Sequence, residues 1–161
     1  MTVRPQTTGF VVMLVALLGL SFGSTTTAQT TTTPVVTPAP TADQILQRCK
    51  DRLAKVVANC AAANKALADR CLPRIQHIVA TGDLEAAKRL ARACCRRIRA
   101  HSTACVKNIG AIRRHCDASI HNAGGGPGVL RKLHRAWKRA VRAVRDSQRT
   151  QCRRLRTAAD G

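Results

Sequence analysis

Six cysteines in the middle of the chain form two mirror-image trios, and no other feature constrains the fold as much. The trios share a spacing of eleven residues: Cys49, Cys60 and Cys71, then Cys94, Cys105 and Cys116. Eleven residues at about 100° each end about 20° past three helical turns, so each trio lies along one helix face. The mirror point falls between Gly82 and Asp83. The pattern predicts two antiparallel helices joined by the disulfides Cys49–Cys116, Cys60–Cys105 and Cys71–Cys94.

The apolar residues agree with this hairpin, although they were not used to derive it. Reflection about the same point places aliphatic residues opposite one another: Leu53 and Ile112, Val56 and Ile109, Leu67 and Ile98, Ile75 and Leu90, Ile45 and Ile120. The only polar pair in this seam is Asn64 opposite His101. We interpret it as a pair that fixes the register of the helices. A histidine that senses pH is the alternative.

A third helix follows a glycine-rich break at 121–128, and the two remaining cysteines connect it to the hairpin. A second reflection, centred in this break, pairs Cys95 with Cys152 and places Trp137 over Gly110. We therefore predict Cys95–Cys152 as a fourth disulfide. Exchanged partners for Cys94 and Cys95 remain an alternative, as does a strained Cys94–Cys95 link. The predicted fold is all-α, a disulfide-laced antiparallel helical hairpin extended to an up-down-up three-helix bundle.

The expected domain covers residues 43–158, with helices at about 43–80, 84–120 and 129–158. Asp43 and Asp83 are the expected N-caps, because aspartate accepts hydrogen bonds from free helical N–H groups. Gly82 suits the C-terminal end of the first helix. Pro73 removes one backbone hydrogen bond inside the first helix, so we expect a kink or a short break near it.

Residues 1–23 resemble a secretory signal peptide, with cleavage as late as residue 28 as an alternative. Arg4 precedes the apolar run Phe10–Leu20, which is shorter than the roughly 20 residues that span a bilayer. Residues 24–42 are rich in Thr and Pro and predict a disordered linker, with or without O-glycosylation. An even count of eight cysteines also favours an oxidising compartment. We expect a secreted, extracellular protein.

The sequence offers no constellation typical of an enzyme. Ligand spacings of eleven along a helix separate sulfurs by about 16 Å, which is too far for zinc. The acidic residues are scattered, and no phosphate-binding loop or nucleophile motif occurs. We expect no catalytic activity, no metal, no cofactor and no small-molecule substrate.

Charge is the second large feature of the chain, whose net charge is +20. One row of basic residues recurs at intervals of three and four along the third helix: Arg131, Arg135, Lys138, Arg142, Arg145, Arg149, Arg153 and Arg156. The second helix could extend this row into a broad basic face through Arg92, Arg96 and Arg99, with Lys88, Arg89 and Arg97 beside them. Arginine favours bidentate contact with sulfate or phosphate.

These residues indicate a protein that binds extracellular polyanions: sulfated glycosaminoglycans, the nucleic acid backbone or an anionic cell surface. One alternative is an inhibitor or effector that docks its basic face on an acidic protein exosite. Another is a cationic host-defence protein. Only Trp137 among the aromatic residues lies outside the signal-like segment, so sequence-specific recognition of single strands is not expected.

Overall fold

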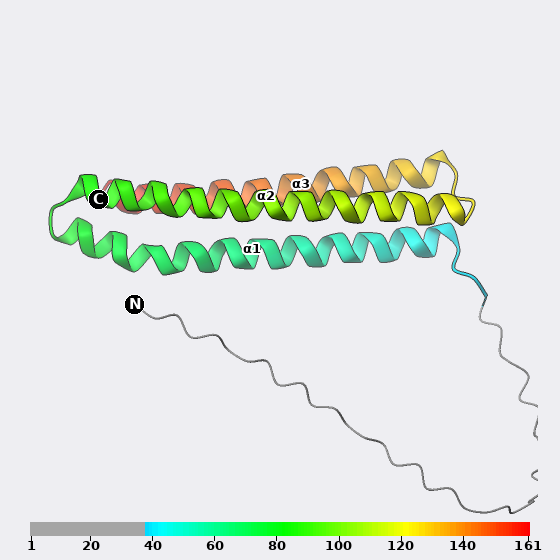
Figure 1. The fold of residues 1–161 in the computed structure, drawn as a ribbon, viewed down its shortest axis with the longest axis horizontal. Helices are drawn as coiled ribbons and strands as arrows, with labels where there is room; N and C mark the ends of the chain where they lie inside the picture. The colour runs from blue at the N-terminus through cyan, green and yellow to red at the C-terminus, as the bar shows by residue number, and fades with distance from the viewer. Residues whose placement is uncertain (1–37) are drawn as a thin grey trace, which may run out of the picture. The chain divides into compact units, whose positions relative to one another are not determined.

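The fold is an up-down-up bundle of three long helices (Figure 1). A computed structural model describes residues 38–161. α1 spans Ala42–Ala80, α2 spans Leu84–Asn122 and α3 spans Pro127–Ala159, and each helix packs against both others. The predicted fold class is confirmed. The predicted signal peptide and most of the predicted linker lie outside the described residues.

Three predicted disulfides are present, and all three join α1 to α2. Cys49–Cys116, Cys60–Cys105 and Cys71–Cys94 have Cα–Cα distances of 6.2, 6.3 and 6.5 Å. These values lie within the range of about 4.4–6.8 Å that a disulfide allows. The exchanged pairing of Cys94 and Cys95 and the link between them are both wrong, because Cys94 is bonded to Cys71.

α1 begins one residue earlier than predicted and is capped by Thr41 rather than Asp43. The Thr41 hydroxyl accepts from the Gln44 N–H at 3.3 Å, and the Gln44 side chain accepts from the Thr41 N–H at 2.9 Å. This reciprocal pair is a capping box, which satisfies two backbone donors where Asp43 would satisfy one. The predicted cap of α2 is confirmed, since Asp83 accepts from the Ala86 N–H at 2.8 Å.

The turn between α2 and α3 is tighter than the glycine-rich sequence suggests. α2 continues to Asn122, and α3 starts at Pro127, two residues before its predicted start. Proline suits a first helical position because the N–H that it lacks would have no partner there. Gly125 packs so closely on the end of α2 that a Cβ atom there would lie 2.3 Å from Ile120 Cγ2.

Pro73 lies inside α1 without breaking it, because the helix is continuous from Ala42 to Ala80. The predicted break is therefore wrong. The N–H that Pro73 lacks would have bonded to the carbonyl of Asp69. Pro73 is exposed and Asp69 is half-buried, so this carbonyl lies on an accessible side of the helix.

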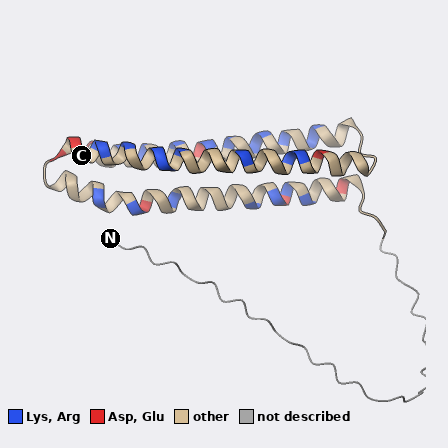
Figure 2. Ribbon diagram, viewed as in Figure 1, with Lys and Arg blue, Asp and Glu red and all other residues tan. Residues whose placement is uncertain are grey.

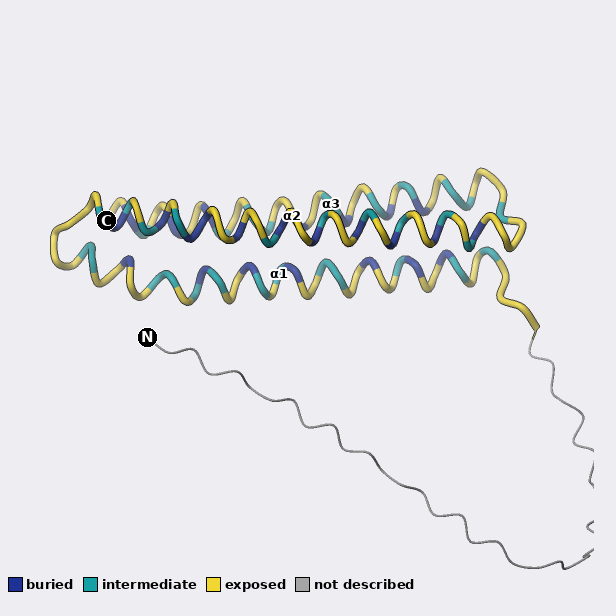
Figure 3. Tube along the Cα trace, viewed as in Figure 1, coloured by how far each residue is buried: buried dark blue, intermediate teal, exposed yellow. Residues whose placement is uncertain are grey.

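The core consists of aliphatic residues and cystines, and it is divided into two clusters along the bundle. Buried positions recur on the sides of α1 and α2 that face each other (Figure 3). One cluster extends to Cys60, Cys105 and Val144, and the other begins at Ala68 and Ile98. No aromatic side chain is buried in residues 38–161, so the disulfides reinforce a core of small side chains.

None of the helices in residues 38–161 has an apolar stretch long enough to cross a membrane.

Candidate anion-binding site

The predicted basic row on α3 is fully exposed. All eight residues, from Arg131 to Arg156, are accessible to solvent. At 100° per residue they point within about 40° of one direction, and they extend for about 38 Å along the helix. Basic residues follow one another along α2 and α3, with few acidic residues between them (Figure 2).

The row lies toward α2 rather than α1, and together the two helices form a basic groove. Three hollows follow the α2–α3 seam, and each contains basic residues. We call this feature the α2–α3 groove and define it by the basic residues that line the three hollows: Lys88, Arg92, Arg113, Arg131, Lys138, Arg142, Arg145, Arg149 and Arg156. The hollows have volumes of about 270, 550 and 660 Å³.

The three α2 residues predicted for this face are all exposed, but they differ in position. Arg92 lines the same hollow as Arg156 of α3. Arg99 and Arg156 both lie near enough to the Cys95 thiol for their positive charges to act to lower its pKa. Arg96 lines none of these hollows. Of the three, only Arg92 therefore lines the groove. Arg99 lies near α3 without lining a hollow, and Arg96 lies outside the groove.

Arg135 and Arg153 of the predicted row also lie outside the hollows, although both are exposed. At about 40° from the centre of the row, they mark its edge on the side away from α2. Two further residues of α2 line the groove: Lys88, which the sequence placed beside the predicted α2 residues, and Arg113, which was not predicted. Whether an α2 residue faces α3 depends on where α3 packs against the hairpin. The cysteine spacing shows only which faces of α1 and α2 meet.

Most of the basic row has no acidic partner. Among residues 38–161, only Arg149 of the row forms an ion pair, with Asp146 at 3.6 Å. The strongest cluster is elsewhere: Asp69 of α1 binds Lys65 and Arg154, both at 2.7 Å. The pKa of Asp69 is lowered, chiefly by the hydrogen bond from Lys65. One charge of α3 is thus neutralised by α1. In the groove, Lys88 pairs with Glu85 at 3.7 Å, Arg113 with Asp117 at 3.3 Å and Arg149 with Asp146. The other six basic residues of the groove form no ion pair in the described structure.

Trp137 lies in the middle of the groove under an arginine. The guanidinium carbon of Arg113 is 4.7 Å from the ring centroid, a cation–π contact between α2 and α3. His134 stacks at a tilt, with ring centroids 5.3 Å apart. The prediction that Trp137 lies over Gly110 is wrong, because no atom of Trp137 is within 4 Å of a Cβ built at Gly110. The residue spacing thus placed Trp137 near this part of α2, but its contact there is with Arg113.

The fourth predicted disulfide is absent. Cys95 and Cys152 are both buried and unpaired. They nevertheless face each other, because the Cys95 sulfur lies 3.6 Å from the Cys152 carbonyl oxygen and the Cys152 sulfur 3.8 Å from the Cys95 carbonyl. Each sulfur thus lies within hydrogen-bonding distance of a backbone carbonyl on the opposite helix. Burial, followed by the hydrogen bond with Cys152, raises the pKa of Cys95 to about 12.

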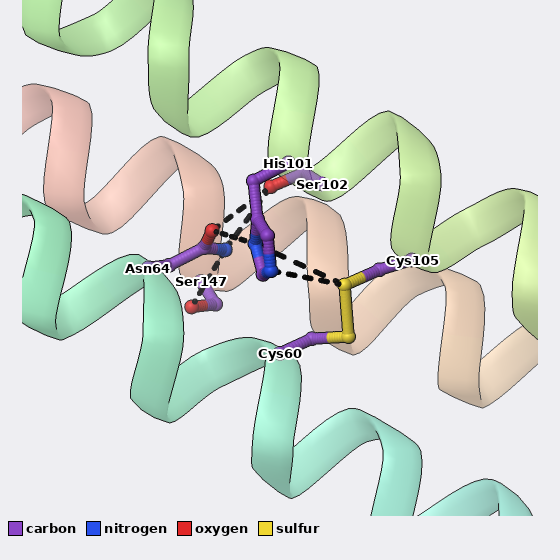
Figure 4. The surroundings of a disulfide bond; sticks show 6 residues. All are labelled: Cys60, Asn64, His101, Ser102, Cys105 and Ser147. Atoms are coloured by element: carbon purple, nitrogen blue, oxygen red, sulfur yellow. Dashed lines mark hydrogen bonds between the residues drawn. A yellow bond between two sulfur atoms is a disulfide. The ribbon is translucent and has the colours of Figure 1, made fainter. Parts of the chain in front are cut away.

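A polar layer crosses the bundle between the two core clusters (Figure 4). His101 Nδ1 lies 3.0 Å from Asn64 Oδ1, so it donates to that carbonyl oxygen. Asn64 Nδ2 donates to the Ser102 hydroxyl at 3.0 Å and the Ser147 hydroxyl at 3.5 Å. The Asn64–His101 contact is confirmed. The two serines were not predicted, because a serine on a helix has no periodic signal.

No group of three or more His, Cys, Asp or Glu side chains within 38–161 is placed to hold a metal ion. Comparisons with protein-family models, curated proteins and solved structures found no match. The α2–α3 groove is therefore the feature from which a function can be inferred.

Proposed function

We propose that this protein binds linear extracellular polyanions, above all sulfated glycosaminoglycans, along the α2–α3 groove. The observation that carries the proposal is the row of exposed basic residues on α3, of which only Arg149 has an acidic partner within the described residues. The neighbouring α2 contributes further cations to the same groove. A charge surplus that is concentrated in this way attracts polyanions more strongly than one that is dispersed.

The shape of the surface favours a linear ligand. Basic side chains follow one another every three or four residues, or about 4.5–6 Å, along a straight helix. A single anion would engage only a short part of a row that extends for about 38 Å. A chain that carries charge at regular intervals can engage the whole row, and its many weak contacts act together.

An anionic ligand also removes a cost that the free protein carries. Like charges at intervals of three and four destabilise a helix by a few tenths of a kcal/mol per pair. α3 carries one acid, Asp146, within this row. Bound sulfates neutralise the repulsion, and the planar arginine side chain binds each sulfate through two parallel hydrogen bonds. Arginine outnumbers lysine on α3 by nine to two, as this chemistry requires.

Secretion, proposed from the N-terminal sequence, decides between sulfated sugars and nucleic acids. Glycosaminoglycans are the polyanions that a secreted protein meets most often. Nucleic acid binding through the backbone needs only the same row of charges. Base recognition would need aromatic platforms, whereas the single Trp137 is half-buried and stacked under Arg113.

Heparin affinity chromatography tests this proposal. We expect the variant R135E/R142E/R149E to elute from heparin at much lower salt than the wild type, because it reverses three charges of the row. The slope of log affinity against log salt should fall by about 2, at roughly 0.7 for each lost contact on a flexible polyanion. Circular dichroism should show unchanged helicity, since all three side chains are exposed.

The matched control reverses three exposed arginines of α1, as R48E/R52E/R74E. These residues form no ion pair in the described structure, and the net charge changes by the same amount. We expect the control to remain closer to the wild type. Equal losses in both variants would show that net charge alone governs retention, and the groove would have no role. Unchanged elution of the α3 variant would contradict the proposal outright.

A further inference from the structure

The middle hollow of the α2–α3 groove brings apolar residues and four basic residues to the same space. The hollow at the other end also has apolar lining, but only two arginines, and Arg113 of these is paired with Asp117. It has a volume of about 550 Å³ and lies between Val106 of α2 and Trp137 and Val141 of α3. Its remaining lining is charged: Lys138, Arg142, Arg145, Asp146 and Arg149. Ligand pockets usually enclose about 300–1,000 Å³ and combine an apolar surface with a few convergent polar groups.

The apolar part of this hollow is built from side chains that the bundle covers only partly. Val106, Trp137 and Val141 are half-buried and pack against the adjacent core cluster. Two helices hold them, so the surface is fixed by the fold. The hollow near Arg92, in contrast, has only the alanines Ala91 and Ala159 as apolar lining.

The charged part of the hollow is mostly positive, with four basic residues and one acidic residue. Lys138, Arg142 and Arg145 follow one another at intervals of four and three, so they line one side of the apolar surface. None of them forms an ion pair in the described structure. Asp146 is engaged by Arg149 at 3.6 Å. Three free cations beside an apolar surface select an anion that also has an apolar part.

We propose that this hollow binds a free single-chain anionic amphiphile, an alkyl chain that ends in a carboxylate, sulfate or phosphate. The alkyl chain lies against Val106, Trp137 and Val141, where it removes apolar surface from water. The head group pairs with Lys138, Arg142 and Arg145, which hold it through charge-assisted hydrogen bonds. This site goes beyond the proposed polyanion binding and does not depend on it.

The chain provides its own reporter for this site. Trp137 is the only tryptophan, and the sequence contains no tyrosine. Intrinsic fluorescence therefore reports on the surroundings of one residue that lines the middle hollow. The probe is dodecanoate, titrated below its micellar concentration into the oxidised protein at low salt. We expect dodecanoate to cause a saturable change in tryptophan emission. Butyrate lacks the long chain and dodecyltrimethylammonium has the opposite charge, so the affinity for each should be at least tenfold lower.

Two variants separate the apolar contribution from the charged one. R142Q/R145Q removes two head-group contacts at exposed positions, and we expect at least a tenfold loss of dodecanoate affinity. V106N/V141N removes the apolar contact, and we expect a similar loss with heparin elution unchanged. R48Q/R52Q on α1 is the control and should bind as the wild type does. Because the R142Q/R145Q substitutions lie outside the core, the test stands even if V106N/V141N folds poorly.

Two results would overturn the inference. One is an equal response to the cationic and anionic amphiphiles, which would indicate unspecific apolar adsorption. The other is a response that begins only when micelles or vesicles are present, which would indicate surface adsorption without a site for the single chain. Heparin retention is measured separately, so loss of amphiphile binding with heparin retained leaves the proposed function standing. Loss of heparin retention with amphiphile binding kept would contradict the proposed function and leave this inference standing.

Discussion

Asn64 has more hydrogen-bonding contacts than any other buried side chain in the described part of the bundle. It is fully buried and contacts His101, Ser102 and Ser147, so it links all three helices at one level. Its place between two aliphatic clusters explains why the helices adopt one register, because a shift along the axis would bury these polar groups without partners. Sequence symmetry could identify the Asn64–His101 pair, but the one partner from α3, Ser147, depends on how that helix is rotated.

We expect Asn64→Ala to lower the free energy of unfolding by about 2–4 kcal/mol. The substitution leaves buried partners without hydrogen bonds, at about 1–3 kcal/mol for each group, and it opens a small cavity. Urea unfolding with the disulfides intact measures this change. Ala62→Ser, at an exposed position of α1, is the control and should change stability by less than about 0.5 kcal/mol. A comparably small effect at Asn64 would show that water replaces the network.

Cys95 and Cys152 make a second prediction at the scale of residues. In the native protein both thiols should resist alkylation at pH 8, because they are buried and the pKa of Cys95 is raised to about 12. In denaturant both should react at once. The pKa of an accessible thiol is about 9.0, so the stability that the raised pKa of Cys95 contributes is fully present below pH 9 and is lost as the pH rises toward 12.

Intact-mass measurement provides the check on this thiol pair. Two alkyl groups added only in denaturant would agree with the structure. No addition, with a mass lower by two further hydrogens, would show that oxidation has closed the Cys95–Cys152 bridge that the spacing predicts. That result would contradict the unpaired thiols and would attach α3 covalently to the hairpin.

At the scale of helices, cysteine spacing made α1 and α2 easier to predict than α3. Three cystines define the contact face, the register and the direction of the hairpin, because each one places two backbones within about 7 Å. α3 has no such marker in the structure, and its rotation depends on packing and on the turn that precedes it. The basic row follows the helical period within α3 and was predicted residue by residue, whereas its α2 neighbour Arg113 depends on how the two helices pack and was missed. The Thr41 cap and the Pro127 start were missed because local hydrogen bonding decides helix ends within a few residues.

The turn that starts α3 gives a prediction with a matched control. We expect Gly125→Ala to destabilise the protein by about 1–3 kcal/mol, because the new Cβ would lie 2.3 Å from Ile120 Cγ2 and 2.8 Å from the Ile120 carbonyl oxygen. Relief requires the backbone of the turn to move. Gly126→Ala, one residue later, meets no atom within 4 Å and should have little effect. Thermal unfolding compares the two variants, and equal midpoints would show that the turn adapts freely.

At the scale of the whole molecule, the three cystines and the surface charge have opposite effects on the stability of the folded state. Residues 38–161 hold 27 basic and 8 acidic residues, and such self-repulsion destabilises a compact state. The core offers little compensation, because aliphatic side chains and alanine bury less area than aromatic residues. Cross-links that restrict the unfolded chain offset this, at about 2–4 kcal/mol each. The structure thus tolerates a concentrated positive surface that an unlinked bundle of this composition would hold less readily.

This opposition predicts how charge, salt and ligand act on stability together. At low salt, R135E/R142E/R149E should melt at a higher temperature than the wild type, because it reduces repulsion along α3, and added sodium chloride should narrow the difference by screening. Heparin oligosaccharides should raise the melting temperature of the wild type more than that of the variant, because a ligand stabilises the state that it binds. Calorimetry at two salt concentrations, with R48E/R52E/R74E as the charge-matched control, measures both effects. If the variant melted lower than the wild type and gained as much from heparin, the basic row would be stabilising in itself, and binding an anion would no longer explain why α3 carries it.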